Sequence, residues 1–203
     1  SRKLFLRNIM HELKTPITKG RLAAEMIEKS KNQERLVSVF IKLENLINEF
    51  AAVEQVTSNI ALNNTKICRI DDVIDEALDI AMVDPGQVTI SKLEDVSLNA
   101  DFKLLAIAAK NMIDNALKYS PNKHVNITIT RESIKFINKG ERLSKELRHY
   151  VEPFTKGESA QKSFGLGLYI VENIIKAHKL TLSYEYKNGL NVFSFENLQN
   201  IAA

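Results

Sequence analysis

Apolar side chains recur at steps of three and four residues through most of the first 56 positions, and this periodicity is typical of packed helices. The first stretch, residues 4–29, repeats Leu6, Met10, Leu13, Ile17, Gly20, Ala24 and Ile27. The second, residues 34–56, repeats Leu36, Phe40, Leu43, Ile47 and Phe50, with a further row at Val39, Leu46 and Val53. A short polar break at residues 30–33 separates them, so the two helices are predicted to pack antiparallel.

The apolar faces of this hairpin are too wide for two helices to cover by themselves. The simplest solution is that two chains associate and form a four-helix bundle, which predicts a homodimer. Pro16 falls inside the first repeat, where it removes a backbone hydrogen bond and predicts a kink near Glu12.

His11 directly follows a residue of the apolar repeat, so it is rotated by about 100° from the bundle core and should face outward. Lys14, Thr15 and Thr18 are predicted to share that outer face. The surface around Lys14, Thr18 and Arg21 would dock a partner with an acidic pocket, or it is only a solvated basic face. An exposed imidazole next to Glu12, which can accept its proton, suits a nucleophile near neutral pH. The alternative is an ordinary surface histidine.

Composition excludes several classes of protein for this chain of 203 residues. Apolar residues make up 44% and charged residues 26%, which is ordinary for a globular domain and excludes disorder of the whole chain. No run approaches the roughly 18 apolar residues of a membrane-spanning helix. The net charge of +3 is too small to indicate nucleic-acid binding by itself. Cys68 is the single cysteine, so no disulfide forms within the chain and a reducing compartment fits.

The pattern changes near residue 60, which predicts a helical domain at 1–60 and an α/β domain at 61–203. In the second domain, strands are expected at 65–70, 88–91, 125–130, 134–138, 180–186 and 190–195, and helices at 71–83, 101–119 and 166–178. Asp71 and Asp72 should cap the first of these helices, and Asp101 the second. The dipeptide Asn188-Gly189 is typical of a tight β-hairpin turn.

Three segments of the second domain carry residues suited to phosphate chemistry. Asn111, Asn115 and Lys118 share one helix face with Tyr119 beside it; carboxamide oxygens suit Mg²⁺ and a lysine suits phosphate. The alternative is a polar helix face. Residues 165–168, Gly-Leu-Gly-Leu, begin a helix where backbone N–H groups can approach phosphate, although a plain loop-to-helix turn has the same pattern. Residues 138–140, Asn-Lys-Gly, end a strand and by themselves indicate only a turn.

Together and in this order, these segments resemble the catalytic core of a sensor histidine kinase from a bacterial two-component system, over nearly the whole chain. Residues 11–16, HELKTP, resemble the phosphoacceptor box; residues 111–121 resemble the N box and 153–156 the F box. Residues 138–140 and 165–168 resemble the two glycine boxes. The resemblance implies an α+β fold: a dimerising helical hairpin, followed by an ATP-binding sandwich of three helices on a mixed five-stranded sheet.

The resemblance also implies roles for individual residues. His11 would accept the γ-phosphoryl group of ATP with Glu12 as its base, then pass it to an aspartate of a response regulator. The place of Thr15, one helical turn after His11, predicts that its hydroxyl positions water for a phosphatase reaction on that regulator; the alternative is that Thr15 is only the residue before a proline. Asn115 would coordinate Mg²⁺. The residues implied to contact ATP are Asn111, Asn115, Lys118, Tyr119, Asn138, Gly140, Lys156, Gly165, Leu166, Gly167 and Leu168.

The sequence departs from the family pattern in both glycine boxes. Asn138 stands where the family has an aspartate, Arg142 replaces a glycine, and Ser163 replaces the first glycine of the second box. The alternative function is therefore a dimeric phosphotransfer or scaffold module that binds ATP weakly. The resemblance implies the cytoplasmic portion of an inner-membrane sensor, with any membrane segments outside this chain.

Overall fold

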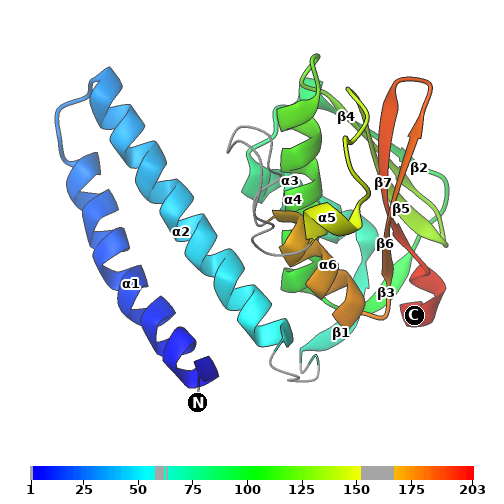
Figure 1. The fold of residues 1–203 in the computed structure, drawn as a ribbon, viewed down its shortest axis with the longest axis horizontal. Coiled ribbons are helices and arrows are strands. Elements are labelled where there is room, and N and C mark those ends of the chain that lie inside the picture. The colour runs from blue at the N-terminus through cyan, green and yellow to red at the C-terminus, as the bar shows by residue number, and fades with distance from the viewer. Residues whose placement is uncertain (1, 58–61, 63, 152–166) are drawn as a thin grey trace. The chain divides into compact units, whose positions relative to one another are not determined.

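The computed structural model describes residues 2–57, 62, 64–151 and 167–203, and it divides into two compact units, residues 1–60 and 61–203. Each unit is described by itself. The first unit is a helical hairpin of α1 (Arg2–Glu25) and α2 (Lys31–Thr57) (Figure 1). Ser30 caps α2, because its hydroxyl accepts a hydrogen bond from the backbone N–H of Gln33 at 3.2 Å. The Gln33 side chain then donates to the carbonyl of Ala24 at 2.9 Å, which closes the connection.

Gly20 of the α1 repeat faces α2 at a point where a larger side chain would not fit. A Cβ atom built at Gly20 would lie 2.4 Å from Cε1 of Phe40, a distance that carbon atoms do not tolerate. The missing side chain therefore lets the Phe40 ring of α2 pack against the backbone of α1. Pro16 lies within α1 and does not end the helix.

The second unit contains a five-stranded mixed sheet in the order β2-β4-β5-β7-β6 and a two-stranded sheet of β1 and β3. Within the described residues, β2 and β4 pair in parallel and the other paired strands are antiparallel. The strands are β1 (Thr65–Arg69), β2 (Val88–Lys92), β3 (Ser97–Asp101), β4 (Val125–Ile129), β5 (Ser133–Lys139), β6 (Thr181–Lys187) and β7 (Leu190–Glu196). The predicted turn is observed, with Asn188 and Gly189 at φ values of 52° and 77° between β6 and β7.

Three helices cover one face of the five-stranded sheet: α3 (Ile70–Ala81), α4 (Phe102–Tyr119) and α6 (Gly167–Ala177) (Figure 1). A short helix, α5 (Arg148–Val151), lies between β5 and α6 in the chain. The core between helices and sheet is apolar and includes the fully buried side chains Leu105, Met112, Ile113, Ile127, Ile134, Phe136, Leu168 and Phe195. The fold predicted from the sequence is thus confirmed in both units.

In this unit the sequence analysis missed one strand, placed one helix cap wrongly and placed another correctly. Residues 97–101 form β3, which the sequence pattern did not predict, because its five residues are held by pairing with β1. Asp71 and Asp72 lie in the first turn of α3 and do not cap it, since the capping position is Arg69. Asp101 does cap α4, because its carboxylate accepts from the N–H of Leu104 at 3.1 Å.

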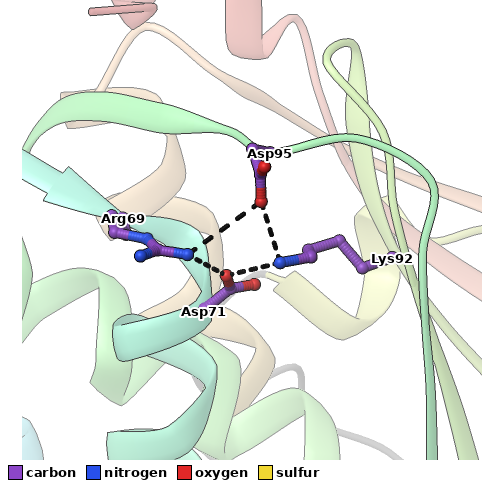
Figure 2. Close-up of polar contacts among 4 residues, drawn as sticks. All are labelled: Arg69, Asp71, Lys92 and Asp95. Carbon is purple, nitrogen blue, oxygen red and sulfur yellow. Dashed lines mark hydrogen bonds and ion pairs between the residues drawn. The ribbon is translucent and has the colours of Figure 1, made fainter.

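Asp71 belongs to a cluster of four charged residues on the surface (Figure 2). Its carboxylate lies 2.9 Å from Lys92 at the end of β2 and 2.9 Å from Arg69, and Asp95 lies 2.9 Å from Lys92. The hydrogen bond from Lys92 lowers the pKa of Asp71. The cluster links the start of α3 to the β2–β3 connection, although each exposed pair contributes little stability.

His178 links the end of α6 to the start of α4 from a buried position. Its Nε2 accepts from the backbone N–H of Asp101 at 3.1 Å, so the ring proton is on Nδ1, which donates to the carbonyl of Ile174 at 2.8 Å. Both ring nitrogens are therefore satisfied in the neutral form, and burial lowers the pKa of His178.

Because the folded protein keeps His178 neutral, we expect the second unit to lose stability as the pH falls from about 7 to about 5. The unfolded chain takes up a proton near the ordinary histidine pKa of about 6.5, while the folded state resists protonation, so acid favours unfolding. Urea unfolding at several pH values should show a smaller pH dependence in His178→Gln than in wild type. An unchanged slope in His178→Gln would contradict the prediction.

Candidate functional site

The polar face of α4 meets the first residue of α6. Asn111 is buried, and its amide nitrogen donates to the carbonyl of Ile107 on its own helix at 3.0 Å. Its oxygen points at Gly167, where an added Cβ atom would lie only 3.1 Å from Asn111 Oδ1 and 3.9 Å from Asn115 Nδ2. The structure therefore brings Gly167 next to Asn111 and Asn115, although more than 50 residues separate Gly167 from this pair in the sequence.

Asn115 offers a ligand at this face a side-chain donor that is buried. Its Nδ2 atom is buried and has no hydrogen-bond partner among the described residues. A buried amide group without a partner is costly, so the site suits a polar ligand here. Among the described residues, no group of three or more His, Cys, Asp or Glu side chains could hold a metal ion. A metal at this face would thus depend on asparagine oxygens and on oxygens of its ligand.

A cavity of about 350 Å³ opens beside Asn115. It is bounded by the last turns of α4, by the end of β5 and the chain that follows it, by α5 and by β7. Its lining residues are Asn115, Ala116, Tyr119, Pro121, Asn138, Glu141, Arg142, Leu143, Ser144, Tyr150, Asn191 and Phe193. Its position and its mixture of aromatic and polar side chains fit a planar heterocycle with hydrogen-bonding edges.

Asn138 of β5 lines this cavity, and Gly140, the residue just after β5, lies next to it in the chain. Asn138 is buried, and its amide nitrogen donates to the carbonyl of Lys139 at 2.8 Å, which leaves its oxygen as an acceptor. An added Cβ atom at Gly140 would lie 3.0 Å from Asn191 Nδ2 and 3.1 Å from the carbonyl oxygen of Tyr119. Gly140 therefore permits a close approach of β5 to the end of α4.

The remaining predicted residues of the second unit lie apart from the cavity or outside the described residues. Lys118 is exposed, with its ammonium group 5.1 Å from the centroid of the Tyr119 ring. The side chain of Leu168 is fully buried in the core. Lys156, Gly165 and Leu166 lie outside the described residues, as does the whole segment that resembles the F box.

Sequence reasoning missed the cavity residues of β7, and it missed Leu143 and Tyr150 in the chain after the first glycine box. Asn191 alternates with Phe193 and Phe195 along β7, so strand periodicity places it on the core-facing side. A polar residue at such a position is the signal that could have identified it. Leu143 and Tyr150 carry no comparable signal, because their place at the cavity depends on how the chain folds back from β5.

In the first unit, the structure places His11, Glu12 and Thr15 on the exposed surface of α1. The prediction that Thr18 shares this exposed face was wrong. The Thr18 hydroxyl donates to Glu44 of α2 at 2.9 Å, and Arg21 Nε lies 3.5 Å from the same carboxylate. Glu44 attracts both side chains to the α2 side of the hairpin, so the exposed face around His11 is shorter than the sequence predicted.

Comparison with known families matches both units. The His kinase A (phospho-acceptor) domain model matches residues 1–86, and the model of the histidine kinase-, DNA gyrase B- and HSP90-like ATPases matches residues 100–198. The first match includes His11, and the second includes the α4 asparagines, Asn138 and Gly167. The second unit therefore has the fold of an ATP-binding domain.

Curated relatives agree over almost the whole chain. The sensor histidine kinase ArsS of Helicobacter pylori is 37% identical over 202 residues, which cover 97% of this chain and 47% of that protein. The heme sensor protein HssS of Staphylococcus epidermidis is 29% identical and covers 96% of this chain and 47% of that protein. The chain spans about half the length of these relatives.

Solved structures show the same fold. The histidine kinase AdeS of Acinetobacter baumannii superposes with a TM-score of 0.64 at 21% identity, covering 93% of this chain and 98% of that one. Full-length ShkA in complex with AMPPNP gives a TM-score of 0.64 at 19% identity, covering 98% of this chain and 46% of that one. The chain belongs to the sensor histidine kinase family. None of its described helices is long and apolar enough to cross a membrane.

Proposed function

We propose that this chain is the catalytic core of an ATP-dependent protein-histidine kinase, which phosphorylates His11 and passes the phosphoryl group to an aspartate of a response regulator. The observation that carries the proposal is the cluster of Asn111, Asn115 and Gly167 at the edge of a cavity closed by Asn138. It occurs in a chain whose first unit exposes a histidine next to a glutamate.

In this reaction an imidazole nitrogen of His11 attacks the γ-phosphorus of ATP. A nitrogen–phosphorus bond forms, the bond from the γ-phosphorus to the bridging oxygen breaks, and ADP leaves with the electron pair. Glu12, the adjacent carboxylate, accepts the proton that the imidazole releases. Phosphoryl transfer depends mainly on positioning and on neutralising phosphate charge.

Different residues of the nucleotide site would position the nucleotide and neutralise the phosphate charge. The oxygen of Asn138 would accept a hydrogen bond from the adenine amino group, and Tyr119 would pack beside the nucleotide. Asn115, with Asn111 nearby, would hold Mg²⁺, which when bound neutralises charge on the phosphates. Lys118 and Lys156 would contribute positive charge, and backbone N–H groups at residues 165–168 would contact phosphate oxygens.

A homodimer is part of the proposal, because the hairpin leaves many large apolar side chains at least one-third exposed. These residues are Leu13, Leu22, Met26, Ile27, Leu36, Val39, Ile41, Leu43 and Leu46. Among the hairpin side chains that the structure describes, Ala24 alone is buried. A second hairpin would cover these faces and complete a four-helix bundle.

We further propose that residues 1–60 form the dimerisation and phosphoacceptor domain and residues 61–203 the ATP-binding domain. The division into two compact units supports this boundary. The core would belong to the cytoplasmic side of an inner-membrane sensor, and the relatives named as sensor proteins support its place in a sensor. The response regulator would dock on the exposed α1 surface around His11.

Calorimetric titration of ATP with Mg²⁺, followed by labelling from γ-labelled ATP, tests the proposal. We expect saturable binding and acid-labile label on the protein, and sedimentation of the same sample should give a dimer. A dimer that binds ATP very weakly and incorporates no label would support the alternative, a phosphotransfer or scaffold module.

Thr15 is predicted to serve the reverse reaction. Its exposed hydroxyl lies one helical turn after His11, where it could position water against a regulator's phosphoaspartate. Thr15→Ala should therefore reduce dephosphorylation of the phosphorylated regulator by about tenfold or more, the scale of a lost positioning contact. Autophosphorylation should change little, with Thr15→Ser as the variant that restores the phosphatase. Equal dephosphorylation rates in wild type and Thr15→Ala would rule out this role.

A further inference from the structure

The chain that leaves β5 is held by side chains of β6 and β7. The backbone N–H of Leu143 donates to the hydroxyl of Tyr184 at 3.0 Å, and that hydroxyl donates to Asn191 Oδ1 at 2.7 Å. Asn191 Nδ2 in turn donates to the carbonyl of Glu141 at 3.1 Å. These three hydrogen bonds form a continuous path from residue 141 through both strands to residue 143, which we call the tyrosine tether.

The residues of the tyrosine tether are packed tightly enough to hold one geometry. Asn191 is 5% exposed, and the Tyr184 ring lies against Phe193 with ring centroids 4.9 Å apart. Burial raises the pKa of Tyr184, so its hydroxyl remains a donor. A second tyrosine of β6, Tyr186, donates to the carbonyl of Gly140 at 3.3 Å. The backbone groups that the side chains of Tyr184, Asn191 and Tyr186 bind all belong to the segment 140–143.

This segment forms one wall of the cavity. Glu141, Arg142 and Leu143 all line it, together with Asn191, whereas Tyr184 does not. Tyr184 therefore reaches the cavity only through the backbone that it holds. From Glu141 to the end of α5 the chain has no glycine, so the backbone of this wall lacks the added freedom that glycine gives.

We propose that Tyr184 is a positioning residue for nucleotide binding, which holds residues 141–143 as a preformed wall beside the base. The inference rests on the proposed function, since it takes the cavity as the ATP site. A preformed wall removes the entropy cost of ordering these residues when ATP binds. Loss of the Tyr184 hydrogen bonds should therefore weaken ATP binding more than it slows the chemical step.

Tyr184→Phe tests this inference, because it removes one hydroxyl and keeps the ring against Phe193. Two hydrogen bonds are lost, so we expect the Kd and KM for ATP to rise about three- to tenfold, with kcat within about twofold of wild type. In the nucleotide-free protein, hydrogen exchange at the Leu143 amide should become faster. The matched control is Ser183→Ala, which removes the hydroxyl of the neighbouring β6 residue, bonded to Glu196 at 3.2 Å, and should change none of these values.

The two readouts separate the possible failures. If wild-type protein binds ATP but Tyr184→Phe has the same Kd, KM and amide exchange, Tyr184 does not position the wall and the inference is wrong. The inference is also wrong if kcat falls while KM stays constant. Wild-type protein that binds no ATP would overturn the proposed function instead, even if the Leu143 amide responds to the substitution.

Discussion

His11→Gln is expected to abolish incorporation of acid-labile phosphate from γ-labelled ATP and to leave ATP binding unchanged. Glutamine keeps a polar side chain with good helix propensity, but its amide nitrogen is not a nucleophile. Because His11 is exposed on α1, the substitution should alter the free energy of unfolding by no more than about 0.5 kcal/mol. Labelling and calorimetric titration on the same preparation measure both quantities.

The matched control for this experiment is His124→Gln in the second unit. His124 contacts the Thr89 hydroxyl at 3.0 Å and the Gly86 carbonyl at 3.1 Å, which are structural contacts away from the cavity. This variant should incorporate label at the wild-type rate. Undiminished acid-labile phosphate in His11→Gln would show that another residue is the phosphoacceptor.

Asn115→Ala should lower the autophosphorylation rate by about 100-fold or more, the usual effect of removing a group that stabilises charge in the transition state. The residue is beside Gly167 and has a buried amide nitrogen without a partner among the described residues. Alanine suits a helix interior and removes that buried amide, so folding should be retained. The Mg²⁺ concentration needed for half-maximal ATP binding should also rise.

Asn126→Ala provides the control for this second experiment. Asn126 is exposed on β4 and lies outside the set of cavity-lining residues, so its loss should affect neither the rate nor the Mg²⁺ requirement. If Asn115→Ala keeps the wild-type rate and Mg²⁺ dependence, Asn115 is not a ligand of the metal. The α4 residues would then form an ordinary polar helix face and not a metal site.

Much of the secondary structure was predictable because its signals are local. The steps of three and four residues identified both hairpin helices, the Asp101 side chain marked the start of α4, and Asn188-Gly189 marked the β6–β7 turn. Each of these depends on residues within a few positions along the chain. β3 was missed because its pairing partner, β1, lies about 30 residues earlier.

The sequence alone also identified the residue types suited to the chemistry, through the order of its motifs. It could not place Asn111 against Gly167, or orient the Asn138 amide toward the Lys139 carbonyl. Likewise, it assigned Thr18 to the outer face, whereas Glu44 of the other helix attracts this side chain.

Composition, periodicity and motif order thus determined the hairpin helices, α3, α4 and α6, and most of the strands, but not the short helix α5. Tertiary structure alone decided the strand order β2-β4-β5-β7-β6, which inserts β7 between β5 and β6. That order brings Asn191 beside Asn138 and lets Tyr184 reach Leu143, 41 residues earlier in the chain. The physical reason is that such contacts join segments distant in the sequence, so their geometry follows from packing the whole sheet and its helices, and no local pattern encodes it.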